Sequence, residues 1–407
     1  MKKIVVTGLG ALTCNGNNVD EFWNSIISGK IGYLDSKFYL QEDFPFPLCG
    51  IVKRLDFSKY LSIEEIKKLD RVTQLSLIAS QMAVKDASID FSLCDRRRIA
   101  VIMGTTCGAN ASVEQDDFVN KWFSRRTEIS KESCEAYLHS AIANEVSKKF
   151  GLQGVSYLVG TACASGNHAI GEGVDLIRLG EADIVICGGA EALNLLPHLG
   201  FNSLNALASN YCAPYDINRD GIVIGEGAGV LVLESEEHAL ARNANIYAEI
   251  SGWSLNCDAE NITAPVEDGS RCADLILSCL KDANLMPNSI DYISLHGTGT
   301  VKNDLSEGRG IQLALKDFCR HPMVSSIKSM IGHTFGAAGA LGSIASIKSI
   351  NNQMVPINAN LSKRDERLNL NLVLQTEMHA KVEVALSLSF GFGGCNVAVL
   401  FNKYKKA

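Results

Sequence analysis

The sequence lacks the features expected of a membrane protein or a nucleic-acid-binding protein. It has no apolar run long enough to cross a bilayer. Its net charge of −7 argues against nucleic acid or an anionic membrane as the main partner. The apolar stretch 4–9 after Met1 is brief and no clean small-residue cleavage site follows it, which favours a first strand over a signal peptide. We expect a soluble cytoplasmic protein.

The cysteines lack the spacing of a disulfide framework or a metal site. There are 13 of them, an odd number, and they are scattered with no C-x-x-C pair. Such cysteines are typical of free thiols in a reducing cytoplasm. We therefore expect no metal, and the chemistry inferred below requires no organic cofactor.

No proline- or serine-rich linker divides the sequence into separate domains. The 407 residues are enough to form a large hydrophobic core. Predicted strands alternate with amphipathic helices, such as 62–87 and 270–283, which favours an α/β protein with parallel-rich sheets. We expect the chain to fold around one shared core.

The two halves of the chain resemble one another in pattern. Four segments of the first half match four of the second: 4–10 with 247–253, 98–106 with 291–300, the segment around Cys163 with 323–347, and 225–234 with 392–401. The repeat predicts two similar halves, 1–245 and 246–407. The glycine- and alanine-rich helices in each half predict close backbone contact between two sheets.

Cys163 stands where a β-branched run ends and a helix-like stretch begins, among small residues from Gly160 to Gly166. This pattern predicts a strand, a tight turn, a thiol and a helix. A thiol at a helix N-terminus faces unpaired N–H groups and the positive end of the helix dipole. Both favour the thiolate, which is the form that attacks acyl groups.

Two histidines in the second half follow apolar stretches and stand beside glycine. His296 lies in Leu295-His-Gly-Thr-Gly-Thr300, and His333 lies in Lys328-Ser-Met-Ile-Gly-His333. One histidine in such a place is usually structural. Two of them together with Cys163 indicate a catalytic site.

Six motifs in order carry a specific resemblance. They are Gly160-Thr-Ala-Cys-Ala-Ser-Gly166, Gly188-Gly-Ala-Glu191, Asp220-Gly-Ile-Val-Ile-Gly-Glu-Gly-Ala-Gly229, His296-Gly-Thr-Gly-Thr300, Lys328-Ser-Met-Ile-Gly-His333 and Ser389-Phe-Gly-Phe-Gly-Gly394. Together they resemble the β-ketoacyl-[acyl-carrier-protein] synthases, elongating condensing enzymes of the thiolase superfamily. The resemblance implies an α/β fold, the thiolase-like duplicated five-layer α-β-α-β-α sandwich.

The resemblance also implies a reaction, the decarboxylative condensation of an acyl group with a malonyl carrier thioester. Cys163 would hold the acyl group. His296 and His333, as neutral N–H donors, would stabilise the enolate left by loss of CO2. The backbone N–H groups of Cys163 and Phe392 would bind the later oxyanion. Lys328 is expected to pair with Glu307 and to tune the histidines.

Substrate and partner residues are expected by the same resemblance. Cys107 falls at the floor of the acyl pocket, and the other expected lining residues are Phe201, Thr298, Thr300 and Phe390. An acidic carrier protein would dock on Lys67, Lys68 and Arg71, the first and last of which would share one helix face. We expect a homodimer or a heterodimer with a related subunit. Acyl length and pathway stay open, with a specialised polyene or polyketide-like lipid as one option.

Three other interpretations carry less weight. Gly225-x-Gly-x-Gly229 resembles part of a dinucleotide fingerprint, but a strand-like run follows it instead of a helix. A degradative thiolase would use a second cysteine, for which Cys395 is the candidate. A non-catalytic chain-length subunit would generally lack the cysteine, whereas Cys163 is present here.

Overall fold

The computed structural model describes residues 2–35, 48–109 and 138–406. In these residues the first half contributes five strands to a sheet. Their spatial order is β1 (Ile4–Leu12), β8 (Gly227–Ser235), β6 (Ile184–Glu191), β4 (Ile99–Gly104) and β5 (Ser156–Val159). The first three strands pair antiparallel, and β6, β4 and β5 pair parallel. Every residue of β1 is buried, as expected for a strand of apolar and small residues inside a protein.

The second half repeats this order and these directions. Its strands are β9 (Ala248–Cys257), β16 (Cys395–Asn402), β15 (Val384–Phe390), β10 (Tyr292–Ser294) and β11 (Met323–Ser325), with the short β13 (Asn371–Leu372) added at the edge. β9, β16 and β15 pair antiparallel, and the strands beyond β15 pair parallel. The four predicted segment matches are confirmed, because each pair occupies the same place in its half.

The halves meet edge to edge and also through a common core. Residues 4–6 of β1 pair antiparallel with residues 248–250 of β9, so the described strands form one continuous sheet. One hydrophobic cluster contains Ile4, Ile170, Ile344 and Phe401, and so draws on both halves. The division at residue 245 itself stays a prediction.

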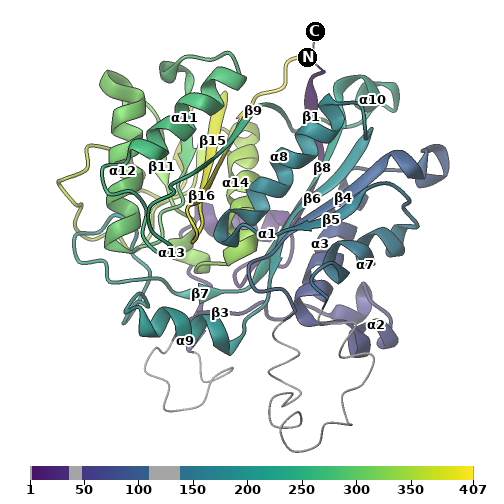
Figure 1. The fold of residues 1–407 in the computed structure, drawn as a ribbon, viewed down its shortest axis with the longest axis horizontal. Coiled ribbons are helices and arrows are strands. Elements are labelled where there is room, and N and C mark those ends of the chain that lie inside the picture. The colour runs from purple at the N-terminus through teal and green to yellow at the C-terminus, as the bar shows by residue number, and fades with distance from the viewer. Residues whose placement is uncertain (1, 36–47, 110–137, 407) are drawn as a thin grey trace, which may run out of the picture.

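Two helices lie between the two groups of strands, and others cover the outer faces (Figure 1). The central pair is α8 (Ser165–Arg178) and α14 (Ala338–Asn352). On the outside, α3 (Arg71–Asp86) and α7 (Ala141–Phe150) cover the first half, while α11 (Ser270–Asp282) and α12 (Val301–Leu315) cover the second. The five-layer α-β-α-β-α arrangement predicted for the chain is confirmed.

Glycine lets the central helices approach closely. A Cβ at Gly166 of α8 would lie 2.7 Å from the carbonyl oxygen of Gly336, and a Cβ at Gly339 of α14 would lie 2.8 Å from the backbone nitrogen of Asn167. Side chains at these positions would force the helices apart. Because α8 begins beside Cys163 and α14 begins soon after His333, this contact holds the Cys163 segment and the His333 segment together.

The predicted helix 62–87 is wrong as a single element. Helix α2 (Ile63–Lys68) ends at Leu69, whose backbone is extended, and α3 begins at Arg71. Asp70 caps the second helix by accepting a hydrogen bond from the Val72 N–H at 2.9 Å. The run 230–233 after the glycine motif is a strand, as predicted, because it lies within β8. The motif itself begins at the end of the short strand β7 (Ile224–Gly225).

Smaller elements complete the described chain: α1 (Val19–Ile27), β2 (Leu34–Asp35), β3 (Leu48–Gly50), α9 (Leu195–Ser203), α10 (Glu236–Ala241), α13 (Lys328–Ile331), β12 (Met354–Val355) and β14 (Met378–His379). Within the described ranges, no helix has the length and apolarity needed to span a membrane. The same ranges contain no group of three His, Cys, Asp or Glu side chains placed to hold a metal ion.

Candidate active site

Cys163 lies in a single turn of 3-10 helix (Ala162–Ala164) between β5 and α8. This is the predicted succession of strand, turn, thiol and helix. Ala162 has a φ of +48°, a left-handed conformation that is unfavourable for alanine. Ser165 holds the turn, since its hydroxyl accepts from the Thr161 N–H at 2.9 Å and lies 2.6 Å from the Ala162 carbonyl oxygen. The strained turn is fixed by the first residue of α8.

His296 follows the end of β10, and its backbone is bound on both sides. The N–H groups of His296 and Gly297 donate to the carboxylate of Glu307 at 2.7 and 2.8 Å. The ammonium group of Lys328 donates to the His296 carbonyl oxygen at 2.5 Å. The ring Nδ1 is buried and has no hydrogen-bond partner in the described structure.

His333 follows Gly332, whose φ of +74° ends α13. The His333 N–H donates to the Val223 carbonyl at 2.6 Å, which ties the turn to the first half of the chain. The ring Nδ1 accepts from the Phe335 N–H at 3.1 Å. The proton of the neutral ring is therefore on Nε2, which leaves that atom as a donor.

Lys328 and Glu307 do not form the predicted ion pair. Within the described residues no ion pair joins them, and both instead bind the backbone of His296, Glu307 at the N–H group and Lys328 at the carbonyl oxygen. Glu307 also accepts from the hydroxyl of the buried Tyr215 at 2.8 Å. Burial raises the pKa of Glu307 and lowers the pKa of Lys328, although the charge of Glu307 acts on Lys328 in the opposite direction. The two charges act on the position of one histidine instead of cancelling in direct contact.

The two histidine rings lie edge to face, with centroids 5.3 Å apart. Burial lowers the pKa of each ring well below its usual value, and the charge of Lys328 adds to this effect. Both rings are therefore neutral near pH 7 and can donate an N–H bond. Phe335 stacks on His333 at 4.8 Å and Phe390 meets His296 edge-on at 5.7 Å, so aromatic contacts fix both rings.

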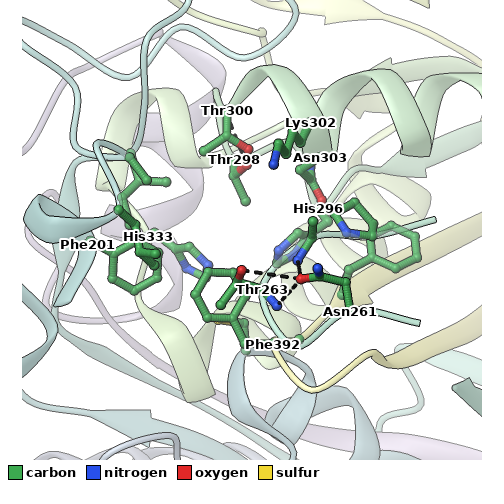
Figure 2. A pocket seen from close by; sticks show the side chains of 18 of the residues that line it. Phe201, Asn261, Thr263, His296, Thr298, Thr300, Lys302, Asn303, His333 and Phe392 are labelled. Carbon is green, nitrogen blue, oxygen red and sulfur yellow. Dashed lines mark hydrogen bonds between the residues drawn. The ribbon is translucent and has the colours of Figure 1, made fainter. Parts of the chain in front are cut away.

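One cavity of about 310 Å³ brings these groups together. Its lining includes Cys163, His296 and His333, as well as the predicted substrate residues Phe201, Thr298, Thr300 and Phe390. In Figure 2, Thr298 and Thr300 lie along one edge of the opening, and Phe392 lies along the facing edge. The segments predicted to supply the nucleophile and the two N–H donors therefore share one site.

The turn carrying Phe392 lies directly against the Cys163 turn. A Cβ at Gly391 would lie 2.6 Å from the Thr161 carbonyl oxygen, so a side chain cannot fit there. In the described chain, the backbone N–H groups of Cys163 and Phe392 donate to no other residue. The Phe392 ring stacks on Phe201 with centroids 5.2 Å apart.

Cys107 is not in the lining of this cavity. Its N–H donates at 3.1 Å to the buried carboxylate of Glu191, which also accepts from the N–H groups of Thr106 and Gly336. Glu191 thus connects the Cys107 turn with the turn after His333. The sequence pattern alone gives Glu191 no role, although an acidic residue at the end of a buried strand signals a polar function.

The predicted carrier-docking residues divide into two groups. Lys67 and Lys68 are exposed in the last turn of α2. Arg71 begins α3, and its guanidinium binds the buried carboxylate of Glu226 through Nε at 2.8 Å and Nη2 at 2.5 Å. The prediction that Lys67 and Arg71 share one helix face is wrong because α2 ends between them.

Burial raises the pKa of the Cys163 thiol to about 12, while the charge of Lys328 lowers it. Position at a helix N-terminus favours the thiolate, but burial acts in the opposite direction and has the larger effect. The side chain is only 5% exposed, and desolvation disfavours the charged form strongly. The resting site therefore holds a protonated thiol.

Known protein families match nearly the whole chain. Residues 1–239 match the N-terminal domain of β-ketoacyl synthases, and residues 247–362 match the C-terminal domain. The chain belongs to the β-ketoacyl synthase family.

Similar proteins extend over the full length of this β-ketoacyl synthase. It is 37% identical to the 3-oxoacyl-[acyl-carrier-protein] synthase 2 of Synechocystis sp. (strain ATCC 27184 / PCC 6803 / Kazusa), with 99% of each chain covered. The corresponding enzyme of Vibrio harveyi is 34% identical, again over 99% of each chain.

Solved structures agree with this assignment. The ishigamide ketosynthase/chain length factor superposes with a TM-score of 0.94 at 32% identity, covering 99% of this chain and 100% of that chain. A ketosynthase complexed with a type II PKS acyl-carrier protein superposes with a TM-score of 0.91, also at 32% identity and with 99% and 100% covered.

Proposed function

We propose that this synthase condenses an acyl group held on Cys163 with a malonyl group on an acyl-carrier protein, giving a β-ketoacyl carrier thioester and CO2. The observation that supports this most strongly is the single cavity lined by Cys163, His296 and His333. The proposal places the chain in fatty acid or polyketide biosynthesis, as its relatives' names suggest.

The reaction divides into two transfers. In the first, the Cys163 sulfur attacks the acyl thioester, loses its proton and releases the carrier thiol. In the second, the C–C bond to the malonyl carboxylate breaks, CO2 leaves, and the electron pair forms an enolate. The enolate carbon attacks the Cys163 thioester, a new C–C bond forms, and the cysteine sulfur leaves.

The proposed roles follow from the positions of the donors. The neutral rings of His296 and His333 would donate to the enolate oxygen as charge develops on it. The free N–H groups of Cys163 and Phe392 would bind the oxyanion formed in either acyl transfer. Lys328 and Glu307 would position His296 through its backbone.

The direct test is mass spectrometry of products formed by this chain from malonyl carrier protein and a panel of acyl carriers. A product two carbons longer with a 3-oxo group supports the proposal and defines the accepted acyl length. Absence of any condensation product across the panel would contradict it.

Two alternatives are less well supported by the site. A thiolase would need a second catalytic cysteine, but Cys395 begins β16 and does not line the cavity. A chain-length subunit would not need the complete set of Cys163, His296 and His333. One similar structure does pair a ketosynthase with a chain length factor, so a related subunit remains a candidate partner.

We propose that the chain also forms a dimer through β5. Among the described strands, β5 lies at the end of the sheet order, and its first residue is exposed. An open strand edge can pair with the same strand of a second copy. None of the described cysteines forms a disulfide, which supports our proposal of a reducing cytoplasm. Light scattering during gel filtration tests the dimer.

Reversing Lys67 and Lys68 to glutamate should raise the KM for carrier-bound substrate. Both residues are exposed on α2, and opposite charges accelerate encounter with an acidic carrier in a salt-dependent way. The salt dependence of kcat/KM should therefore become flatter. Activity with a small uncharged thioester should change little. Equal loss with both substrates would show a structural effect of the two lysines.

Alkylation of Cys163 by iodoacetamide should accelerate about tenfold between pH 7 and pH 8. The raised pKa, about 12, means that the thiol is protonated throughout this range and that the thiolate fraction grows with pH. Peptide mass spectrometry at timed intervals gives the rate at Cys163. A rate that is flat from pH 6 to pH 9 would show that the thiolate is already formed at rest and would contradict this expectation.

A further inference from the structure

Lys302 carries the single cationic side chain in the lining of the active-site cavity, as far as the described residues go. It is exposed and lies in the first turn of α12. Figure 2 shows its amine directed toward the opening, near Thr298. Lys328, the other lysine of the site, is buried behind His296 and does not line the cavity.

The ammonium group of Lys302 has no ion-pair partner within the described chain. The lining contains two carboxylates, Asp220 and Asp258, and each has partners of its own. Asp220 accepts from the N–H and the hydroxyl of Ser209, and Asp258 accepts from the Asn396 amide at 2.7 Å. Within the described chain, neither carboxylate forms an ion pair with Lys302.

The neighbouring polar groups are already engaged. The hydroxyls of Thr298 and Thr300 lie 2.9 Å apart and bond to each other. The Asn303 amide donates to the buried Asp304 at 3.1 Å, and the charge of Asp304 is balanced by Arg219. Lys302 is therefore the group at this rim that is most available to an anionic ligand.

A carrier-bound substrate brings two kinds of negative charge to this cavity. The malonyl carboxylate must reach the buried, neutral histidines, where it leaves as CO2. The phosphodiester of the phosphopantetheine arm lies at the opposite end of the arm from the thioester, so it stays near the surface through both transfers. An exposed ammonium at the rim matches the place of the phosphate.

Building on the function proposed above, we propose that Lys302 binds the phosphate of the phosphopantetheine arm. It is thus a specificity residue, not a catalytic one. A lysine ammonium is a compact point charge that suits a phosphate oxygen without fixing one geometry. The contact would favour carrier-bound thioesters over thioesters that lack the phosphate.

The test compares two small substrates that differ by the phosphate alone, malonyl-phosphopantetheine and malonyl-pantetheine, with Cys163 already acylated. Replacing Lys302 by methionine should raise the KM for the phosphorylated substrate about five- to tenfold, the size expected for one exposed charge-assisted bond. The kcat should not change, and neither constant should change for malonyl-pantetheine. Lys302→Arg should restore most of the phosphate preference.

Lys281→Met on α11 is the matched control, since this lysine is also exposed but does not line the cavity. An equal effect of Lys302→Met on both small substrates, or no effect on either, would overturn the proposal. An effect seen only with the intact carrier protein would overturn it too, because Lys302 would then contact acidic residues of the carrier.

A binding measurement separates this proposal from the proposed reaction. Calorimetry with phosphopantetheine and with pantetheine requires no turnover, so it tests Lys302 even if wild-type protein forms no condensation product. The proposal is supported if Lys302→Met binds phosphopantetheine more weakly than wild type does but binds pantetheine equally well. Identical binding of phosphopantetheine by wild type and variant contradicts it.

Discussion

Replacing Cys163 by alanine should abolish acyl transfer to the enzyme while leaving the fold intact. In the proposed reaction the thiol is the nucleophile that forms the enzyme thioester, and alanine provides no atom that can replace it. Alanine also fits the turn, because the flanking residues Ala162 and Ala164 already have side chains of this size. Intact-mass measurement after incubation with an acyl-carrier thioester should show one added acyl group in wild type and none in the variant.

Cys257→Ala is the control that tests selectivity. Cys257 is exposed, whereas Cys163 is buried, so accessibility alone would favour acylation of Cys257. The control variant should still gain one acyl group. Acylation of Cys163→Ala at the wild-type level would contradict the assignment, provided that thermal unfolding shows the variant to be folded.

The duplicated fold could be predicted because its signals are local. Each half places an apolar strand such as β1 or β9 before a second strand that ends at small residues, and each half has a glycine-rich central helix. Hydrophobic periodicity and glycine positions can be read directly from the sequence, and no tertiary contact needs to be known to interpret them. Cys163, His296 and His333 were found for the same reason, since each stands at the end of a recognisable strand or turn.

The contacts among these segments could not be read from the sequence. Lys328 and Glu307 carry opposite charges, which suggests a direct pair, but each binds a backbone group of His296 instead. The pairing of Arg71 with Glu226 depends on residues 155 positions apart. In both cases a long-range contact decides what a charged side chain does, and the local pattern is silent about it.

The state of the Cys163 thiol shows a second limit. Helix position can be inferred from local pattern, and it favours the thiolate. Burial depends on the whole fold, and here it has the larger effect and raises the pKa to about 12. Local structure therefore placed Cys163 at a turn in the cavity, as predicted, but could not give the protonation state of its thiol.

Replacing His296 or His333 by alanine should slow CO2 release from malonyl carrier protein by about 100-fold or more, the usual cost of removing one oxyanion donor from a preorganised site. The rings lie 5.3 Å apart and are both neutral near pH 7, so each can donate to one enolate oxygen. Cys163 should still become acylated in both variants. Radiolabelled CO2 release gives the decarboxylation rate, and intact mass gives the acylation level.

The geometry of His333 allows a finer test within the same assay. Its Nδ1 accepts from the Phe335 N–H, so the donor is Nε2, and the amide nitrogen of glutamine can reach a similar position. His333→Gln should therefore recover part of the decarboxylation lost in His333→Ala. His321→Ala serves as the control, because the His321 side chain is half exposed and outside the cavity lining. Near wild-type decarboxylation in both His296→Ala and His333→Ala would show that the enolate is stabilised elsewhere. Loss of Cys163 acylation to the same degree would show that the rings act in acyl transfer instead.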